Sequence, residues 1–336
     1  MLDYIFTALA PILLGCVALY GSKSVTDQNE FMSKQYTTML KAVCCIIVIL
    51  VHIPLVKQNK LQDGIGSFAY ICVTLFFLIS AYGMKLSITK KQDYLKHFWR
   101  NRLAALLIPQ ILVNIFGILL TFRIKSIEWF SIFNLNSYVV VLLSYCLWFY
   151  IVYLGRSFYS KKKTIDSLLM AGIIISSIFS YFMMEKTYWC YERFGLLWGL
   201  ILFLNIDKIK TIVNPTAKRI TIYLIICLIF GVAYLKFKYV FFWGEYLLKI
   251  ILGLSIILFV FSLSSKRVFG NRVLNYLGNI SYEVYLSHGI IMSFLMHYFP
   301  NLSSGIFILF TITMTIIFSS VVHSLGKPIV KLVRSK

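Results

Sequence analysis

The chain has 336 residues, of which 60% are hydrophobic and only 13% are charged. Soluble domains carry about 25% charged residues, so this chain has too few polar side chains to cover a soluble surface. The formal net charge is +21, which in a soluble protein would indicate nucleic-acid binding. The low polar content instead requires that most of the exterior faces lipid.

Eleven apolar segments follow one another along the chain, each about 20 residues long, which is the length that crosses a bilayer. Backbone groups find no water in lipid, so such segments form helices, and the alternating faces of membrane strands are not seen. We therefore predict an all-α fold, a polytopic transmembrane helical bundle of about 10–11 helices. The expected spans are 4–20, 38–56, 66–86, 103–122, 137–155, 164–183, 191–206, 220–236, 245–263, 280–298 and 304–324.

Lys and Arg concentrate in alternate connections between these spans. Basic residues at the end of a span are counted with the adjoining connection, as for Lys41, Lys85 and Lys249. Of the 33 basic residues, 24 then belong to connections after odd-numbered spans and 9 to the other side. Cytoplasmic loops carry an excess of Lys and Arg, which predicts an N-terminus outside the cell and a C-terminus in the cytoplasm. The positive charge thus reports membrane orientation, and we expect no nucleic-acid partner.

The first 35 residues are expected to form an additional transmembrane helix and a cytoplasmic linker, ahead of a membrane domain over 36–336. The first segment carries Asp3 and lacks a basic start. It is therefore a poor signal peptide, and we expect the helix to be retained.

The second span holds two ionisable residues, Lys41 and His52. They are about three helical turns apart, so they lie on one face and are separated by about 16 Å along the axis. An ionisable residue within an apolar span is a functional candidate by default.

Two later features allow both structural and functional interpretations. Ser80, in the third span, fits either close helix packing or the lining of a cavity. Arg100 and Arg102 abut the fourth span, where guanidinium groups suit either membrane anchoring or a bidentate hold on phosphate.

The same choice remains open for polar and aromatic residues further along the chain. Trp148 fits the interfacial aromatic belt or a substrate site. Glu192 either pairs with groups in a cavity or reaches the interface. Glu283 and His288 form either a structural hydrogen-bonded pair or a functional one.

The chain contains no nucleotide-binding glycine motif and no nucleophile elbow, so no ATP-driven mechanism is expected. Seven cysteines occur without CxxC or zinc-type spacing. We expect them to be small buried apolar residues, and we expect no metal.

Five stretches, in matching order, resemble the motifs of the acyltransferase-3 family of integral membrane acyltransferases, over about residues 36–325. The departures are Lys41 for the family's Arg, Ala81 for Gly, and Ala105 where the second Arg of an RxxR pattern would stand. The stretches are KAVCCIIVILVH (41–52), YICVTLFFLISAYG (70–83), WRNRLAALLIP (99–109), LWF (147–149) and SYEVYLSH (281–288).

The resemblance implies that residues 36–336 transfer an acyl group, usually acetyl. The donor would be cytoplasmic acyl-CoA, and the acceptor a hydroxyl of an extracytoplasmic polysaccharide or lipid-linked sugar. The setting would be a bacterial cytoplasmic membrane. The oligomeric state is left open.

Roles for individual residues follow from the same resemblance. His52 would be the general base, since an imidazole's ordinary pKa of about 6.5 suits proton transfer near neutral pH, and a transient acyl-histidine is the alternative. Glu283 would support it, and Arg100, Arg102 and Lys41 would hold the phosphates of acetyl-CoA. The expected substrate-binding residues are Trp148, Glu192, Ser80, Tyr285 and His288.

A second class of function also fits the sequence. A transporter that exports a finished glycan or lipid would equally carry ionisable residues within its spans. The chain shows neither inverted repeats nor paired broken helices, which favours the enzyme.

Overall fold

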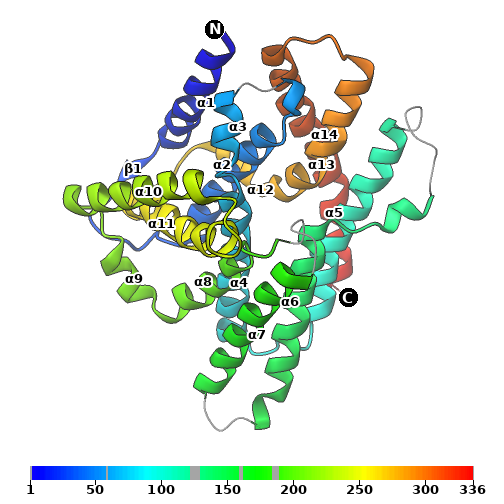
Figure 1. The fold of residues 1–336 in the computed structure, drawn as a ribbon. Helices are drawn as coiled ribbons and strands as arrows, with labels where there is room; N and C mark the ends of the chain where they lie inside the picture. Colours follow the sequence, from blue (N-terminus) through cyan, green and yellow to red (C-terminus); the bar gives the residue numbers. More distant parts are fainter. Residues whose placement is uncertain (1, 58–59, 122–128, 159–161, 184–188, 336) are drawn as a thin grey trace.

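The structure is a computed structural model, and it describes residues 2–57, 60–121, 129–158, 162–183 and 189–335. The described backbone is almost entirely helical (Figure 1). Its elements are α1 (Leu2–Leu19), β1 (Lys23–Ser24), α2 (Lys34–Val51), η1 (Leu55–Lys57), α3 (Lys60–Gly66), α4 (Tyr70–Lys90), α5 (Phe98–Thr121), η2 (Trp129–Phe133), α6 (Ser137–Leu154), η3 (Gly155–Phe158), α7 (Lys162–Met183), α8 (Phe194–Leu204), α9 (Ile206–Ile212), α10 (Ala217–Phe237), η5 (Trp243–Leu247), α11 (Leu248–Ser264), β2 (Arg267–Val268), α12 (Arg272–Asn279), α13 (Ser281–Tyr298) and α14 (Ser304–Ser335).

A helix forms at each of the eleven predicted spans, and the predicted all-α membrane bundle is confirmed. Within the described residues, eight helical segments are long and apolar enough to cross a membrane. The other three predicted spans correspond to α1, to α8, which has only 11 residues, and to α13, which carries several polar side chains. The eight segments contain α2, α4, α5, α6, α7, α10, α11 and α14.

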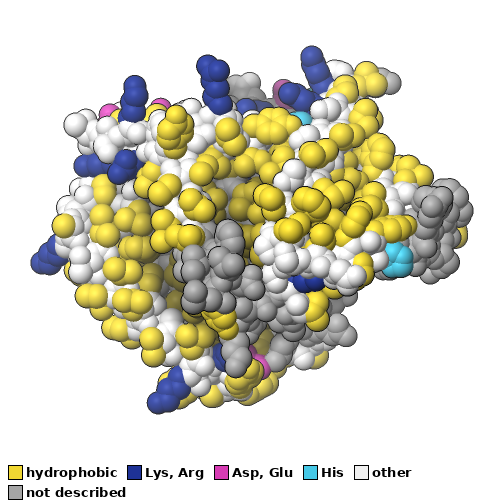
Figure 2. Space-filling model, turned by 90° about the horizontal axis from the view of Figure 1, so that it is seen from above, with side chains coloured by type: hydrophobic (Ala, Val, Ile, Leu, Met, Phe, Trp, Pro, Cys, Tyr) yellow, Lys and Arg dark blue, Asp and Glu magenta, His cyan; other side chains and the backbone are white. Residues whose placement is uncertain are grey.

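Large apolar side chains cover the outside of the bundle. In α10, all of which is described, only Tyr234 is buried, whereas Leu228, Ile229 and Val232 are exposed. Hydrophobic side chains also dominate the view in Figure 2, with Lys and Arg mostly at its rim. Such a surface is stable in lipid and not in water, so the chain is an integral membrane protein.

Contacts between the segments that connect the helices agree with the membrane sides to which the charge pattern assigns those segments. Strand β1 follows the first predicted span and pairs antiparallel with β2, which follows the ninth. Lys57, after the second span, donates hydrogen bonds to the carbonyls of Pro300 (2.8 Å) and Leu302 (2.6 Å), after the tenth. Each contact joins segments that the alternation of helices places on one side of the membrane.

Helix α8 packs closely on α4 through a GxxxG segment, Gly195 to Gly199. A Cβ atom at Gly195 would lie 2.1 Å from the Thr74 carbonyl oxygen, and one at Gly199 would lie 2.3 Å from that of Leu78. Small residues at this spacing let the backbones of two membrane helices touch. These glycines therefore fix α8 against α4.

Lys85 was counted among the charges of a cytoplasmic connection, and the structure corrects that assignment. Helix α4 continues to Lys90, so Lys85 lies inside the bundle and is 1% exposed. It forms an ion pair with Asp166 of α7 and donates a hydrogen bond to Tyr153 Oη of α6 at 2.6 Å. The ion pair and this hydrogen bond together join α4, α6 and α7.

Candidate functional site

The two histidines named from the sequence, His52 and His288, lie side by side. His52 is the C-cap of α2 and is exposed, whereas His288 is buried in the middle of α13. Their ring centroids are 4.8 Å apart, with the planes tilted by 59°. Residues more than 230 positions apart in the chain thus form one imidazole pair.

Hydrogen bonds to the backbone fix the orientation of both rings. Nδ1 of His52 lies 2.8 Å from the carbonyl oxygen of Val48, and Nδ1 of His288 lies 2.7 Å from that of Tyr285. A carbonyl oxygen can only accept, so each Nδ1 carries the proton and each neutral ring presents the lone pair of Nε2. Because the His52 residue is exposed, its Nε2 atom can accept a proton from a hydroxyl group.

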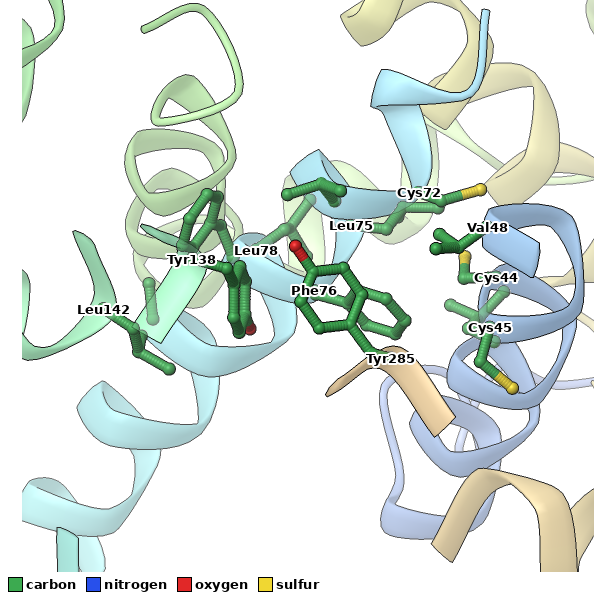
Figure 3. Packing of buried hydrophobic residues seen from close by; sticks show 14 of the residues in the cluster. Cys44, Cys45, Val48, Cys72, Leu75, Phe76, Leu78, Tyr138, Leu142 and Tyr285 are labelled. Atoms are coloured by element: carbon green, nitrogen blue, oxygen red, sulfur yellow. The ribbon is translucent and has the colours of Figure 1, made fainter. Parts of the chain in front are cut away.

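Aromatic side chains of the core lie next to this pair, and Figure 3 shows three of them, Phe76, Tyr138 and Tyr285. The Tyr285 ring lies 5.9 Å from His288 and 5.0 Å from Tyr138. The Ser80 hydroxyl donates to the Phe76 carbonyl at 2.8 Å and interacts with the Tyr138 hydroxyl. The structure thus links Ser80 and Tyr285 to the two histidines through a continuous layer.

Glu192 reaches this layer from the turn before α8. It is 2% exposed, and its Oε2 atom has no hydrogen-bond partner among the described residues. Its carboxyl interacts electrostatically with Lys249 and with Tyr285. Lys249 itself lies 4.0 Å from the centre of the Tyr191 ring and donates to its hydroxyl at 2.6 Å. Its relation to Tyr285 is thus electrostatic, and substrate binding by Glu192 stays a prediction.

Glu283 lies in the first turn of α13, and its partners are not the two histidines His52 and His288. Its Oε1 atom accepts a hydrogen bond from Nδ1 of His323 on α14 at 2.8 Å. Lys41 interacts with the same carboxylate electrostatically. Glu283 thus groups with His323 and Lys41, and a catalytic role for Glu283 stays a prediction.

Trp148 faces α7 in the structure. Its Nε1–H donates to the Leu168 carbonyl at 3.2 Å, and a Cβ atom at Gly172 would lie 2.1 Å from that nitrogen. An indole has one N–H donor, and here α7 already uses it. Contact of Trp148 with substrate stays a prediction.

A basic cavity of about 480 Å³ lies beside the start of α5. Arg102 lines it, donating to Tyr94 Oη at 2.7 Å, with its guanidinium carbon 5.8 Å from the centre of the Phe98 ring. The described residues that line it are Lys91, Asp93, Tyr94, His97, Phe98, Asn101, Arg102 and Arg334.

Arg100 points away from Arg102, because helical residues two apart do not share a face. It donates to Nδ1 of His97 at 3.1 Å, and its buried Nε has no hydrogen-bond partner among the described residues. Its connection to the cavity is therefore through His97. Phosphate binding by Arg100, Arg102 and Lys41 stays a prediction.

A second cavity, of about 280 Å³, opens between α5, η2 and α13. It includes Gly289, which directly follows His288, and a Cβ atom at Gly289 would meet open space. Most of its lining side chains are small or carry hydroxyl or amide groups. They are Asn114, Gly117, Ile118, Thr121, Ser131, Gly289, Ile290 and Ser293.

His323 and Arg334 are among the residues at these sites that sequence reasoning missed. The sequence does not mark His323 as a site residue, because it lies at the end of a predicted span and its partner Glu283 is 40 residues earlier. Arg334 was counted only as an inner-side charge. That pattern places Arg334 and Arg102 on one side of the membrane, but it cannot bring them together.

No group of three or more His, Cys, Asp or Glu side chains that could hold a metal occurs in the described parts of the chain.

Comparison with known proteins then identifies the family. A family model described as an acyltransferase domain matches residues 35–324, which is most of the chain. No curated protein and no solved structure matches the chain. The chain therefore belongs to the acyltransferase-3 family and is a membrane acyltransferase.

Proposed function

We propose that this protein transfers an acetyl group from cytoplasmic acetyl-CoA to a hydroxyl of an extracytoplasmic polysaccharide or lipid-linked sugar. The membrane would be the cytoplasmic membrane of a bacterium. The observation that carries the proposal is the exposed His52 ring at the end of α2, which keeps its Nε2 atom available for a substrate proton.

His52 acts as the general base in the proposed reaction. Its Nε2 takes the proton of the acceptor hydroxyl while the hydroxyl oxygen attacks the thioester carbonyl. The C–S bond then breaks, and the CoA thiolate leaves and takes the proton from the imidazolium. Because Nδ1–H can donate to the Val48 carbonyl in both protonation states, the ring need not turn during the reaction.

The basic cavity is the proposed donor site, with Arg102 on the phosphates. Guanidinium groups hold phosphate through paired hydrogen bonds. Tyr282 of α13 donates to the Leu106 carbonyl of α5 at 2.9 Å, which sets the register of the two helices. Arg102 lies four residues before Leu106, and His288 lies six residues after Tyr282. At about 1.5 Å per residue, these offsets place the basic cavity and the imidazole pair about 15 Å apart along the helix axes. An extended pantetheine arm has a comparable length, and it would bring the thioester to His52.

The cavity beside Gly289 is the proposed acceptor site. Its lining residue Gly289 directly follows His288, which contacts the His52 ring. The amide and hydroxyl groups of the cavity match the hydrogen-bonding groups of a sugar. By the predicted orientation, it lies in the outer half of α5 and α13, toward the side from which the acceptor comes.

The test uses membranes that contain the protein, acetyl-CoA labelled in its acetyl group, and the surface glycan of the host as acceptor. The acetylated glycan is measured by mass spectrometry. Loss of a general base typically lowers the rate by about 10²–10⁴, so His52→Gln should reduce labelling by that factor at equal expression. His297→Gln, the same change at an exposed histidine of α13, is the matched control and should label normally.

The outcome separates the enzyme from the transporter. Labelling by the His52→Gln protein at the native rate would remove His52 from the mechanism. Glycan that reaches the surface in a protein-dependent manner without acquiring label would favour export.

A further inference from the structure

The basic cavity contains a residue from the opposite end of the chain. Arg334 lies in the last turn of α14, ten residues beyond the matched family region. Its Nη2 atom donates to the Asn101 carbonyl of α5 at 3.2 Å. That hydrogen bond holds the guanidinium of Arg334 at the same cavity as Arg102.

The charge in this cavity is unbalanced. Arg102, Arg334 and Lys91 line it together with His97, and among the described lining residues Asp93 is the single acidic one. The charges of Arg102 and Arg334 interact with each other, and like charges this close repel unless an anion lies between them. The cavity therefore favours a ligand with more than one negative charge.

The two arginines differ in exposure. Arg334 is exposed at the mouth, and Arg102 is half-buried and already held by Tyr94 and Phe98. In CoA the diphosphate adjoins the pantetheine arm, and the 3′-phosphate lies on the ribose, at the far end from the thioester. A donor whose arm extends toward His52 would leave its 3′-phosphate at the mouth.

We propose that Arg334 binds the 3′-phosphate of CoA, while Arg102 binds the diphosphate. This inference rests on the proposed function, because it takes acyl-CoA as the donor. A phosphomonoester carries a charge of about −1.5 to −2 near neutral pH, and the fork of a guanidinium matches its oxygens. An anionic lipid headgroup offers the same phosphate chemistry, so the experiment must distinguish the two sources.

The experiment measures binding of CoA and of 3′-dephospho-CoA to the purified full-length protein in lipid nanodiscs. A hydrogen bond to a charged group contributes about 1.5–3 kcal/mol, which corresponds to roughly a 10- to 100-fold change in Kd. The native protein should bind CoA more tightly than 3′-dephospho-CoA by about this factor. Arg334→Gln should weaken CoA binding by the same factor and leave 3′-dephospho-CoA binding unchanged.

Matched controls separate this role from general charge and from lipid binding. Lys331→Gln removes an exposed cation one helical turn away on α14, and it should leave both constants unchanged. The series is repeated in neutral phosphatidylcholine and in anionic phosphatidylglycerol. An effect of Arg334→Gln that appears only in anionic lipid, or that is equal for both ligands, would overturn the assignment.

Failure of this inference can be told apart from failure of the proposed function, because binding does not require acyl transfer. If CoA binds with the expected 3′-phosphate preference but no glycan is acetylated, the site stands and the proposed reaction falls. If neither ligand binds, both fall. If acetylation occurs and Arg334→Gln does not change CoA affinity, only the assignment of Arg334 is wrong.

Discussion

Removing Lys85 should destabilise the bundle strongly, although this residue was first counted as a loop charge. The side chains of Lys85 and Asp166 are 1% and 10% exposed, so the pair is shielded from water. Breaking such a pair by removing one partner costs about 3–5 kcal/mol, because the other charge stays buried without compensation. Lys85→Met should therefore lower the free energy of unfolding by about that amount.

The measurable quantity is the unfolding temperature of the purified protein in detergent. Domains of 150–250 residues shift by about 2–4 °C per kcal/mol, which makes the expected fall roughly 6–20 °C, or somewhat less for a longer chain. The double variant Lys85→Met with Asp166→Leu removes both charges and should recover most of the loss. Lys90→Met, at an exposed lysine of the same helix, should have little effect.

A different result would refute the reasoning about the ion pair. If the double variant is as unstable as Lys85→Met alone, the loss comes from packing or from the hydrogen bond to Tyr153, and not from an uncompensated charge. If Lys85→Met behaves like Lys90→Met, the pair is not shielded as described.

Two glycines give contrasting predictions for activity and for folding. Gly289→Leu places a side chain in the open space of the cavity beside His288, so the KM for the acceptor should rise while the affinity for the donor is kept. In the control Gly305→Leu a Cβ also meets open space, and both constants should stay unchanged. Gly199→Leu drives a side chain against the Leu78 carbonyl, so the yield of monodisperse protein should fall sharply. The control Gly231→Leu, on the lipid-facing α10, should not reduce that yield.

The membrane architecture follows from the sequence because hydropathy and charge act locally. An apolar run of the right length must become a helix in lipid, and a helix forms at every predicted span. The same local rule misplaces Lys85, since the hydropathy of its own segment does not reveal that Asp166 lies opposite. A partner 81 residues away decides whether a charge lies in a loop or in the core.

The candidate site was predictable as a set of residues, and its pairings were not. His52 and His288 were both named, yet nothing in either segment indicates that their rings touch. Glu283 was named as support for His52, and the structure pairs it with His323 because α14 packs along α13. The pairs depend on the register between helices, which a single sequence does not display.

Helix α13 can carry polar side chains because other helices surround it. Lipid-facing helices such as α10 are apolar because polar groups in hydrocarbon have no partners. Helix α13 packs against α2, α5 and α14. Its Glu283 and Ser287 pair with His323 and, at 2.9 Å, with Ser319 of α14, and His288 bonds to the Tyr285 carbonyl of α13 itself. A helix enclosed by other helices can therefore carry ionisable groups through the middle of a membrane. In this chain, α13 is not among the eight long apolar segments, and it carries His288, which contacts the proposed base His52.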